Sequence, residues 1–222
     1  MSSIKICDLF NTEETLAAEL FSGVTYPWEV LPKIKDFIVK LGETLDAEKF
    51  DKIGDDIWVA KSAKVAPTAC LNGPLIIDED AEIRHCAFVR GSAIVGKGAV
   101  VGNSTELKNV VLFNKVQVPH YNYVGDSVLG FKAHMGAGSI TSNVKSDKTL
   151  VVIKDVEERI ETGLKKVGAM LGDNVEVGCN SVLNPGTVIG RNSNVYPTSC
   201  VRGVIPGNSI FKNNGEIIAK SE

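Results

Sequence analysis

Aliphatic residues recur at every sixth position along most of this chain. One series runs in steps of six over Val59–Leu107, and a second runs in the same steps over Leu171–Val201. A second, mostly small residue lies four positions after each aliphatic one, as at Ala81 and Ala87. An α-helix repeats every 3.6 residues and a simple strand every two, so neither explains this period.

A triangular coil does explain it. Each hexapeptide supplies one flat face, its aliphatic side chain fills the interior, and the small residue fits the corner. Three faces make a coil of about 18 residues that stacks on the next coil and buries a continuous core. We therefore predict a mainly β fold, a left-handed parallel β-helix of hexapeptide repeats, which is an exception to the right-handed crossover rule.

The repeat divides the chain into three parts. Residues 1–52 lack the repeat and predict a helical N-terminal cap, with one helix after Asn11 and another from Pro27 to Gly42. We expect this segment to shield the first coil from edge pairing, in preference to a role in substrate recognition or oligomer docking. Residues 53–206 form the predicted β-helix, and residues 207–222 form a C-terminal strand tail.

The period is interrupted between Asn109 and Met170, where we expect a loop to leave the coil at about residues 142–168. The β-branched run Thr149–Ile153, together with Glu157–Ile160, predicts a projecting hairpin. Loops inserted into a rigid solenoid are where binding and chemistry usually take place. We therefore look for the functional residues at this break.

Composition narrows the class of protein. The net charge of −3 argues against a nucleic-acid partner or a general attraction to anionic membranes, and no apolar run reaches membrane-spanning length. The N-terminus shows no secretory signal. No two cysteines have the Cys-x-x-Cys spacing of a redox or zinc site, so reduced thiols in a cytoplasmic protein are the simplest interpretation.

The three histidines, His85, His120 and His134, raise the hypothesis of a carbonic-anhydrase-like zinc centre. His85 and His120 are close to two coils apart, but His134 is not a whole coil further on. The close histidine pair of that arrangement is also missing. We therefore predict no metal site and no requirement for a metal.

A stronger group of residues lies where the repeat breaks. The stretch His120–Asp126 has the sequence His-Tyr-Asn-Tyr-Val-Gly-Asp. Upstream, Arg90 and Lys108 are one coil apart, which stacks two cations on one face. A shared anion such as a phosphate would explain the pair, and two solvated surface residues would explain it equally well.

The segment Arg90–Lys148 resembles the acetyltransferase domain of the bifunctional UDP-N-acetylglucosamine pyrophosphorylase / glucosamine-1-phosphate N-acetyltransferase. That family has an Arg, a Lys 18 residues later, a Gly-His-x-x-Tyr-x-Gly-Asp stretch and a Gly-Ala-Gly-Thr-Ile-Thr-x-Asn run. Here Arg90, Lys108, His120–Asp126 and Gly136–Asn143 match these motifs at the same spacings.

The resemblance implies a role for each matched residue. His120 corresponds to the general base that deprotonates the sugar amine, and Asn143 to the residue that orients this amine. The residues that correspond to phosphate-holding positions are Arg90, Lys108 and Tyr123. The residues that correspond to the acetyl-CoA site are Ala137, whose backbone lies near the thioester, and Cys179 and Pro197 along the CoA arm.

Departures from the family pattern leave the sugar undecided. His134 stands where the family has Asn, and Val144 stands where it has Tyr. The following loop is shorter, so either Lys145 or Lys148 takes the place of a phosphate-binding lysine. Because these positions belong to the sugar site, we expect either glucosamine-1-phosphate or galactosamine-1-phosphate as acceptor.

The function implied by the resemblance is acetyl transfer from acetyl-CoA to an amino-sugar 1-phosphate, in UDP-N-acetylglucosamine biosynthesis, by a cytoplasmic homotrimer. Residues 1–52 are too short for a nucleotide-binding domain, so a separate nucleotidyltransferase is an expected partner. Two alternatives remain. One is a non-catalytic nucleotide-sugar-binding or regulatory subunit. The other is an acetyltransferase of the same fold with a different acceptor.

Overall fold

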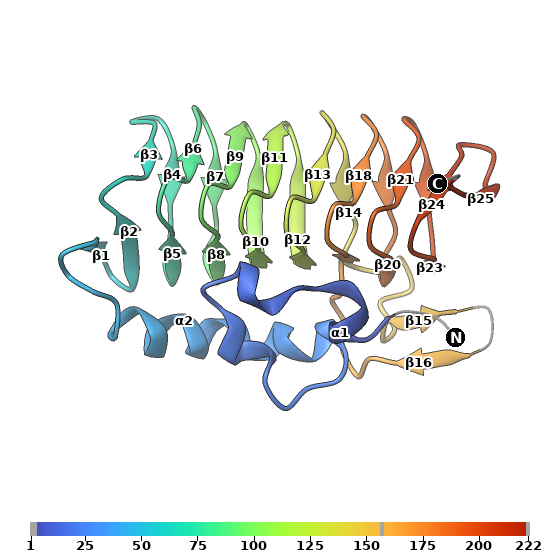
Figure 1. Cartoon of the computed structure of the whole chain (residues 1–222), viewed down its shortest axis with the longest axis horizontal. Helices are drawn as coiled ribbons and strands as arrows, with labels where there is room; N and C mark the ends of the chain where they lie inside the picture. Colours follow the sequence, from blue (N-terminus) through green and yellow to red (C-terminus); the bar gives the residue numbers. More distant parts are fainter. Residues whose placement is uncertain (1–3, 156–157, 221–222) are drawn as a thin grey trace.

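A computed structural model describes residues 4–155 and 158–220, and its short strands stack into a three-faced parallel β-helix (Figure 1). Equivalent residues of successive coils pair in parallel, as Ile83 does with Val101 and Val101 with Val118. These residues are buried in the interior of the coil. The predicted hexapeptide β-helix is thus confirmed, while its left-handed winding stays a prediction.

The first face of the solenoid is a nine-stranded sheet. Its strands alternate an outward polar or exposed residue with an inward apolar one, because successive side chains of a strand point to opposite sides. The strands are β3 (Lys64–Val65), β6 (Glu82–Ile83), β9 (Val100–Asn103), β11 (Gln117–His120), β13 (His134–Met135), β18 (Glu176–Val177), β21 (Asn194–Val195), β24 (Ser209–Phe211) and β25 (Ile217–Ala219).

The second and third faces together form a 14-stranded sheet. The second face comprises β4 (Cys70–Leu71), β7 (Phe88–Val89), β14 (Ile140–Thr141), β19 (Val182–Leu183) and β22 (Cys200–Val201). The third comprises β1 (Phe50–Gly54), β2 (Ile57–Ala60), β5 (Leu75–Ile77), β8 (Ala93–Val95), β17 (Ala169–Leu171), β20 (Thr187–Ile189) and β23 (Val204–Ile205). Two longer strands run through both faces, β10 (Glu106–Leu112) and β12 (Tyr123–Leu129).

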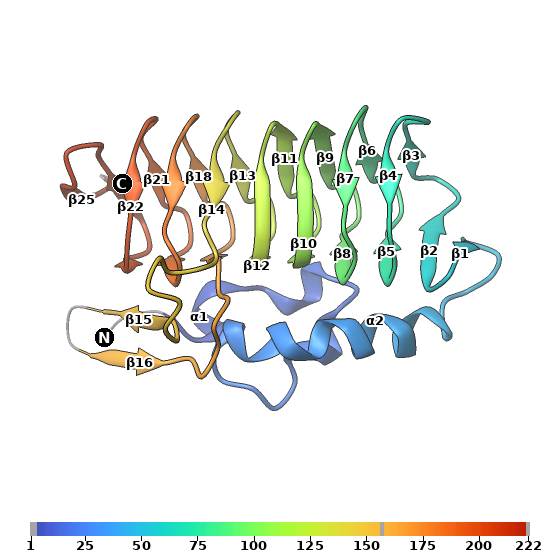
Figure 2. The same cartoon turned by 180° about the vertical axis from the view of Figure 1, so that it is seen from behind.

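The sequence predicted that the N-terminal segment covers the first coil. In the structure, this segment lies along the third face of the solenoid (Figures 1 and 2). Strands β5 and β8 of this face are buried on both sides, and Trp58 of β2 faces Gly42 so closely that a Cβ on Gly42 would lie 2.4 Å from the indole. Apolar residues on the outer side of β5, β8 and β10 need this cover. The segment consists of α1 (Ile6–Leu9), η1 (Thr12–Glu14), η2 (Ala18–Phe21), η3 (Pro27–Lys33) and α2 (Ile34–Gly42).

Aromatic and polar contacts fix this segment to the solenoid. The ring of Phe113 is fully buried, and its centroid lies 5.2 Å from that of Phe10 and 5.4 Å from that of Phe21. Asp173 accepts a hydrogen bond from the backbone N–H of Asn11 at 2.7 Å. The backbone N–H of Asp173 in turn donates to Leu9 O at 2.9 Å. The segment is therefore an integral layer of the fold.

Antiparallel strands close both ends of the solenoid. Strand β1 pairs with β2 at the first coil, and β25 pairs with β24 at the last. The interrupted stretch forms a third hairpin, β15 (Val152–Lys154) with β16 (Arg159–Glu161), close to where the sequence predicted one. Glu157 of that prediction lies outside the described residues. Within the described ranges, no helix is both long and apolar enough to cross a membrane.

Candidate active site

The corner between the first and second faces places one residue per coil in a single column. Strand pairing defines this column. His120 lies beside Asn103, and the pairing of Gln117 with His134 places Ala137 beside His120, three residues further on. Equivalent pairs extend the column in both directions. Backbone hydrogen bonds link neighbouring coils, from Gly138 N to His120 O at 3.0 Å and from Asn180 N to Ala137 O at 2.8 Å. The residues of this corner column are His85, Asn103, His120, Ala137, Cys179 and Pro197.

A left-handed residue follows most positions of the column and makes the turn tight. Tyr121 has φ 51°, Asn180 has φ 55° and Gly138 has φ 71°. A chain that reverses direction this sharply leaves the side chain of the corner residue on the outside, and His120 and Cys179 are exposed. The predicted base and three predicted acetyl-CoA residues are thus neighbours along one edge.

Buried Asn122 holds the turn after His120 against the next coil. Its amide Nδ2 donates to Gly136 O at 2.9 Å and to Ser139 O at 3.0 Å, and its Oδ1 accepts from His120 N at 3.1 Å. An amide that is buried with both donors and acceptor satisfied has one orientation. Asn122 therefore sets the position of His120 relative to the turn that contains Ala137.

The turn around Ala137 offers a free backbone donor. Gly136 N donates to Val177 O at 2.7 Å and Gly138 N donates to His120 O. For Ala137 N–H, lying between them, no acceptor is found in the part of the chain that the structure describes. A backbone N–H without a partner beside an exposed imidazole is the arrangement that an oxyanion requires.

A groove runs beside the C-terminal half of the corner column. It encloses about 570 Å³ and its lining includes Cys179, Tyr196, Pro197 and Ile210. His134, predicted to touch the sugar, also lies here, and its Nδ1 is 2.7 Å from Glu176 Oε2. The structure separates His134 from the predicted phosphate residues because β13 belongs to the first face and Lys108 to the second.

The predicted sugar residues surround one buried carboxylate on the second face. Asp126 Oδ1 accepts from Lys108 Nζ at 2.8 Å and from Asn109 Nδ2 at 2.9 Å. Asp126 Oδ2 accepts from Asn143 Nδ2 at 2.5 Å. The sequence placed Asp126 in a motif but gave it no role, and the structure makes it the organising group of this cluster.

Tyr123 completes the cluster. Its phenol oxygen accepts a hydrogen bond from Asn143 Nδ2 at 3.2 Å, which leaves the phenol hydrogen free to donate. Burial raises the pKa of Tyr123, so the phenol stays protonated at neutral pH. Asn143 Oδ1 accepts no hydrogen bond from the described residues and can meet a donor on a ligand.

The two stacked cations each have a carboxylate of their own. Arg90 Nη1 lies 2.8 Å from Glu106 Oε1 in an exposed ion pair, and Lys108 is paired with Asp126. The protein itself therefore offsets their repulsion, and the stacked pair alone does not require a shared anion. Nevertheless, both still line one pocket of about 390 Å³.

The two candidate lysines of the shortened loop lie elsewhere. Lys145 Nζ donates to Thr149 Oγ1 at 2.5 Å and lies 3.4 Å from Asp147 Oδ2. Lys148 is exposed, with φ 56°. Among the described residues, neither lysine hydrogen-bonds to Tyr123, Asn143 or Asp126, so the structure does not bring them into the cluster.

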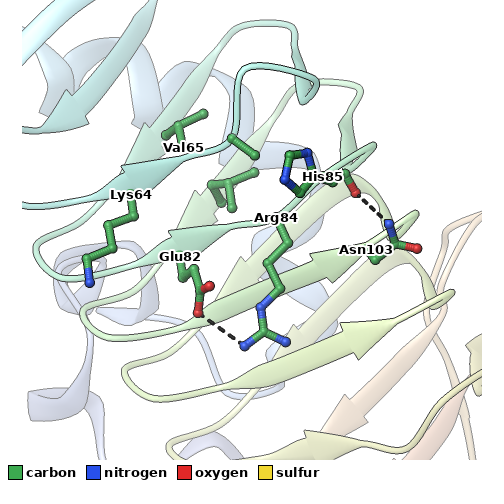
Figure 3. Close-up of a pocket in the computed structure, with 8 residues that line it drawn as sticks. Lys64, Val65, Glu82, Arg84, His85 and Asn103 are labelled. Atoms are coloured by element: carbon green, nitrogen blue, oxygen red, sulfur yellow. Dashed lines mark hydrogen bonds and ion pairs between the residues drawn. The ribbon is translucent and has the colours of Figure 1, made fainter.

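The three histidines also remain apart in their contacts. His85 follows β6 and its Nδ1 lies 2.8 Å from Thr68 Oγ1, whereas His134 belongs to β13 in the middle of the same sheet. Figure 3 shows His85 beside a second pocket, of about 450 Å³, with Arg84 paired to Glu82 and Asn103 donating to His85 O. Over residues 4–155 and 158–220, no three His, Cys, Asp or Glu side chains are grouped to hold a metal ion.

Comparison with known proteins identifies the family. Residues 71–205, more than half of the chain, match the family model of the GMPPB C-terminal domain. The chain belongs to this family. The match runs from β4 to β23 and so covers most of the solenoid. It includes every residue of the corner column and of the Asp126 cluster.

Two curated relatives of this GMPPB C-terminal domain protein are named as bifunctional proteins. The bifunctional protein GlmU of Methanococcus maripaludis is 28% identical over 219 residues, covering 90% of this chain and 49% of the relative. The bifunctional sugar-1-phosphate nucleotidylyltransferase/acetyltransferase of Sulfurisphaera tokodaii is 31% identical over 160 residues, covering 64% and 40%. The chain thus spans about half the length of these relatives, or less.

Two solved structures that match part of the chain are described as an acetyltransferase domain and an N-acyltransferase. The acetyltransferase domain of PglB from Neisseria gonorrhoeae, in complex with acetyl coenzyme A, is 15% identical, with a TM-score of 0.34, covering 72% of this chain and 55% of that one. The N-acyltransferase AntD from Bacillus cereus, in complex with dTDP and coenzyme A, is 17% identical, with a TM-score of 0.40, covering 78% and 92%. Similarity at this level does not assign a function.

Proposed function

We propose that this chain is an acetyl-CoA-dependent N-acetyltransferase whose acceptor is the amine of glucosamine-1-phosphate or galactosamine-1-phosphate. One observation carries the proposal. Exposed His120 lies one coil from the unpaired N–H of Ala137 on the corner column, so a base and an oxyanion donor are adjacent. The curated relatives, whose names include acetyltransferase and GlmU, support the same activity.

The reaction requires one proton acceptor and one oxyanion donor. His120 takes a proton from the sugar ammonium, and the free amine attacks the thioester carbonyl carbon of acetyl-CoA. The oxyanion of the tetrahedral intermediate accepts a hydrogen bond from Ala137 N–H. Collapse of the intermediate breaks the carbon–sulfur bond, and the departing thiolate takes the proton from His120. The attacking nitrogen then gives up its remaining extra proton to the freed imidazole, which releases it to solvent.

The Asp126 cluster binds the acceptor. Arg90 and Lys108 bind its phosphate, because both line the 390 Å³ pocket. Asn143 orients the amine through its free Oδ1, while the phenol of Tyr123 donates to a sugar or phosphate oxygen. Asp126 takes no part in the reaction in this account, and it fixes the side chains of Lys108 and Asn143.

Acetyl-CoA lies along the corner column in this proposal. Its thioester meets Ala137, and its arm follows Cys179 and Pro197 into the groove that also contains His134. An open groove on one flat face leaves room for the neighbouring solenoid of a homotrimer to cover the arm. We expect a cytoplasmic protein that works beside a separate nucleotidyltransferase.

A thiol-release assay tests the proposal. Purified protein is incubated with acetyl-CoA and either glucosamine-1-phosphate or galactosamine-1-phosphate, and free CoA is measured with a thiol reagent. Loss of general-base catalysis in His120→Ala lowers kcat by about two to four orders of magnitude. His85→Ala is the matched control, because His85 is exposed on the same corner column but lies three coils away from Ala137.

The outcomes separate the candidate functions. Turnover that collapses in His120→Ala and persists in His85→Ala supports the proposal, and the preferred sugar identifies the acceptor. Thiol release with another amine, but with neither sugar phosphate, indicates a different acceptor. No thiol release from a folded protein that still binds a nucleotide sugar refutes the proposal and indicates a non-catalytic binding subunit.

A further inference from the structure

The pocket that contains Arg90 and Lys108 has a second wall. This wall comes from the N-terminal segment, where the end of η3 and the first turn of α2 contribute Leu31, Pro32 and Lys35. Helix α2 packs against β5, β8 and β10, so this wall is held by the same contacts that bury the third face. A cation from the non-repetitive segment therefore lies at the predicted phosphate-binding pocket.

The charges of this pocket do not balance. Arg90 is paired with Glu106 at 2.8 Å, and Lys108 is paired with Asp126 at 2.8 Å. Lys35 is exposed, and within the described part of the chain no carboxylate oxygen lies within 4.0 Å of its ammonium. The excess positive charge of the pocket thus belongs to Lys35, and an anionic ligand would neutralise it.

We propose that Lys35 is a substrate-binding residue that binds the phosphate of the acceptor, which makes the N-terminal helical segment part of the acceptor site. This inference rests on the proposed function. A phosphomonoester carries about two negative charges and presents three oxygens at neutral pH. Arg90 and Lys108 already share their charge with carboxylates, and Lys35 supplies the cation that has no internal partner.

The N-terminal segment then does more than cover apolar strands. The packing of α2 against β5, β8 and β10 holds Lys35 in place beside the solenoid. A phosphate bound between Lys35 and Arg90 would contact both layers of the protein. Specificity for a phosphorylated sugar over the free sugar would depend on this second wall.

Steady-state kinetics of Lys35→Gln test the inference. We expect the KM for the amino-sugar 1-phosphate to rise about tenfold to a hundredfold, as for the loss of one hydrogen bond to a charged group. The kcat and the KM for acetyl-CoA should change by less than about twofold. Lys35→Arg should retain most of the affinity, and Lys40→Gln is the control, since Lys40 is exposed on the same helix and outside the pocket.

A binding measurement distinguishes failure of the inference from failure of the proposed function. Inorganic phosphate and glucosamine-1-phosphate are titrated into wild type and Lys35→Gln by calorimetry, without acetyl-CoA, after equal melting temperatures have shown that both are folded. Equal affinities or an unchanged KM would overturn the role of Lys35 and leave the acetyltransferase standing. Phosphate binding that is lost in Lys35→Gln, in a wild-type protein without turnover, would support the anion site and refute the reaction.

Discussion

Replacement of Asp126 by Asn would disturb the cluster at its centre. The carboxylate is buried and accepts from three different side chains, Lys108, Asn109 and Asn143. An amide has the same size but only one acceptor oxygen. Its NH₂ group would face either Lys108 and Asn109 or Asn143, and each of these presents a donor.

The loss can be estimated from these contacts. If the remaining oxygen stays with Lys108 and Asn109, the hydrogen bond from the lysine becomes one to a neutral acceptor, and Asn143 Nδ2 meets a second donor. A hydrogen bond to a charged group contributes about 1.5–3 kcal/mol, and an unsatisfied buried donor costs about 1–3 kcal/mol. Lys108 is 28% exposed, so solvent screens part of the first term. We expect Asp126→Asn to lower the free energy of unfolding by about 2–4 kcal/mol.

Urea unfolding followed by tryptophan fluorescence measures this change, because Trp28 and Trp58 are both buried in the native protein. Glu106→Gln is the control, since it removes a carboxylate of the same face from an exposed ion pair and should have a much smaller effect. A variant with Asn at 126 that lies within about 0.5 kcal/mol of wild type would refute the organising role assigned to Asp126.

Two further predictions concern the turns around the site. Asn122→Ala removes the donors to Gly136 O and Ser139 O, so we expect the free energy of unfolding to fall by about 1–3 kcal/mol. We also expect a lower kcat with an unchanged KM for the sugar phosphate. Equal kcat values in the variant and in wild type would contradict the role of Asn122 in positioning His120. Burial raises the pKa of Asp173, so its ionisation opposes folding, and the stability that the protonated group provides is lost as pH rises from about 3.8 through the raised pKa. Urea unfolding at several pH values should therefore show wild type losing stability relative to Asp173→Asn over that window, and parallel curves would contradict the sign.

The solenoid was predictable because its signal is local and repeated. Each coil needs an inward aliphatic residue and a small corner residue, and both leave a period of six in the sequence. The same period, extended by the family resemblance, singled out His120, Ala137, Cys179 and Pro197, which the structure aligns along one corner. Their catalytic and binding roles remain predictions.

The sequence did not predict the face on which His134 lies. Its face depends on an exact count of residues per coil, and the period is interrupted after Asn109, so the count could not be continued to His134. The parallel register of Gln117 with His134 and of His134 with Glu176 places it on the first face. Resemblance alone had assigned it to the sugar site.

The sequence predicted that the N-terminal segment is helical, but it did not predict that this segment packs along the third face. Its position depends on tertiary contacts with the third face, which leave no period in its own sequence. One signal was present in the solenoid itself. Leu75–Ile77 and Ala93–Val95 are continuous apolar runs, whereas Glu82–Ile83 and Glu176–Val177 alternate. A strand that is apolar on both sides must be covered on both sides, and this pattern could have placed α2, and with it Lys35.

The hairpin of β15 and β16 leaves the solenoid and returns without disturbing the stacking. Tyr123 pairs with Ile140 before the excursion, and Ile140 pairs with Val182 after it, both in parallel register. Each coil contacts only its neighbouring coils, so the length of a loop inserted between two strands can change without disturbing the stack. Over evolution, a protein built this way can acquire or lose a projecting hairpin as a unit, while the coils on either side keep their register.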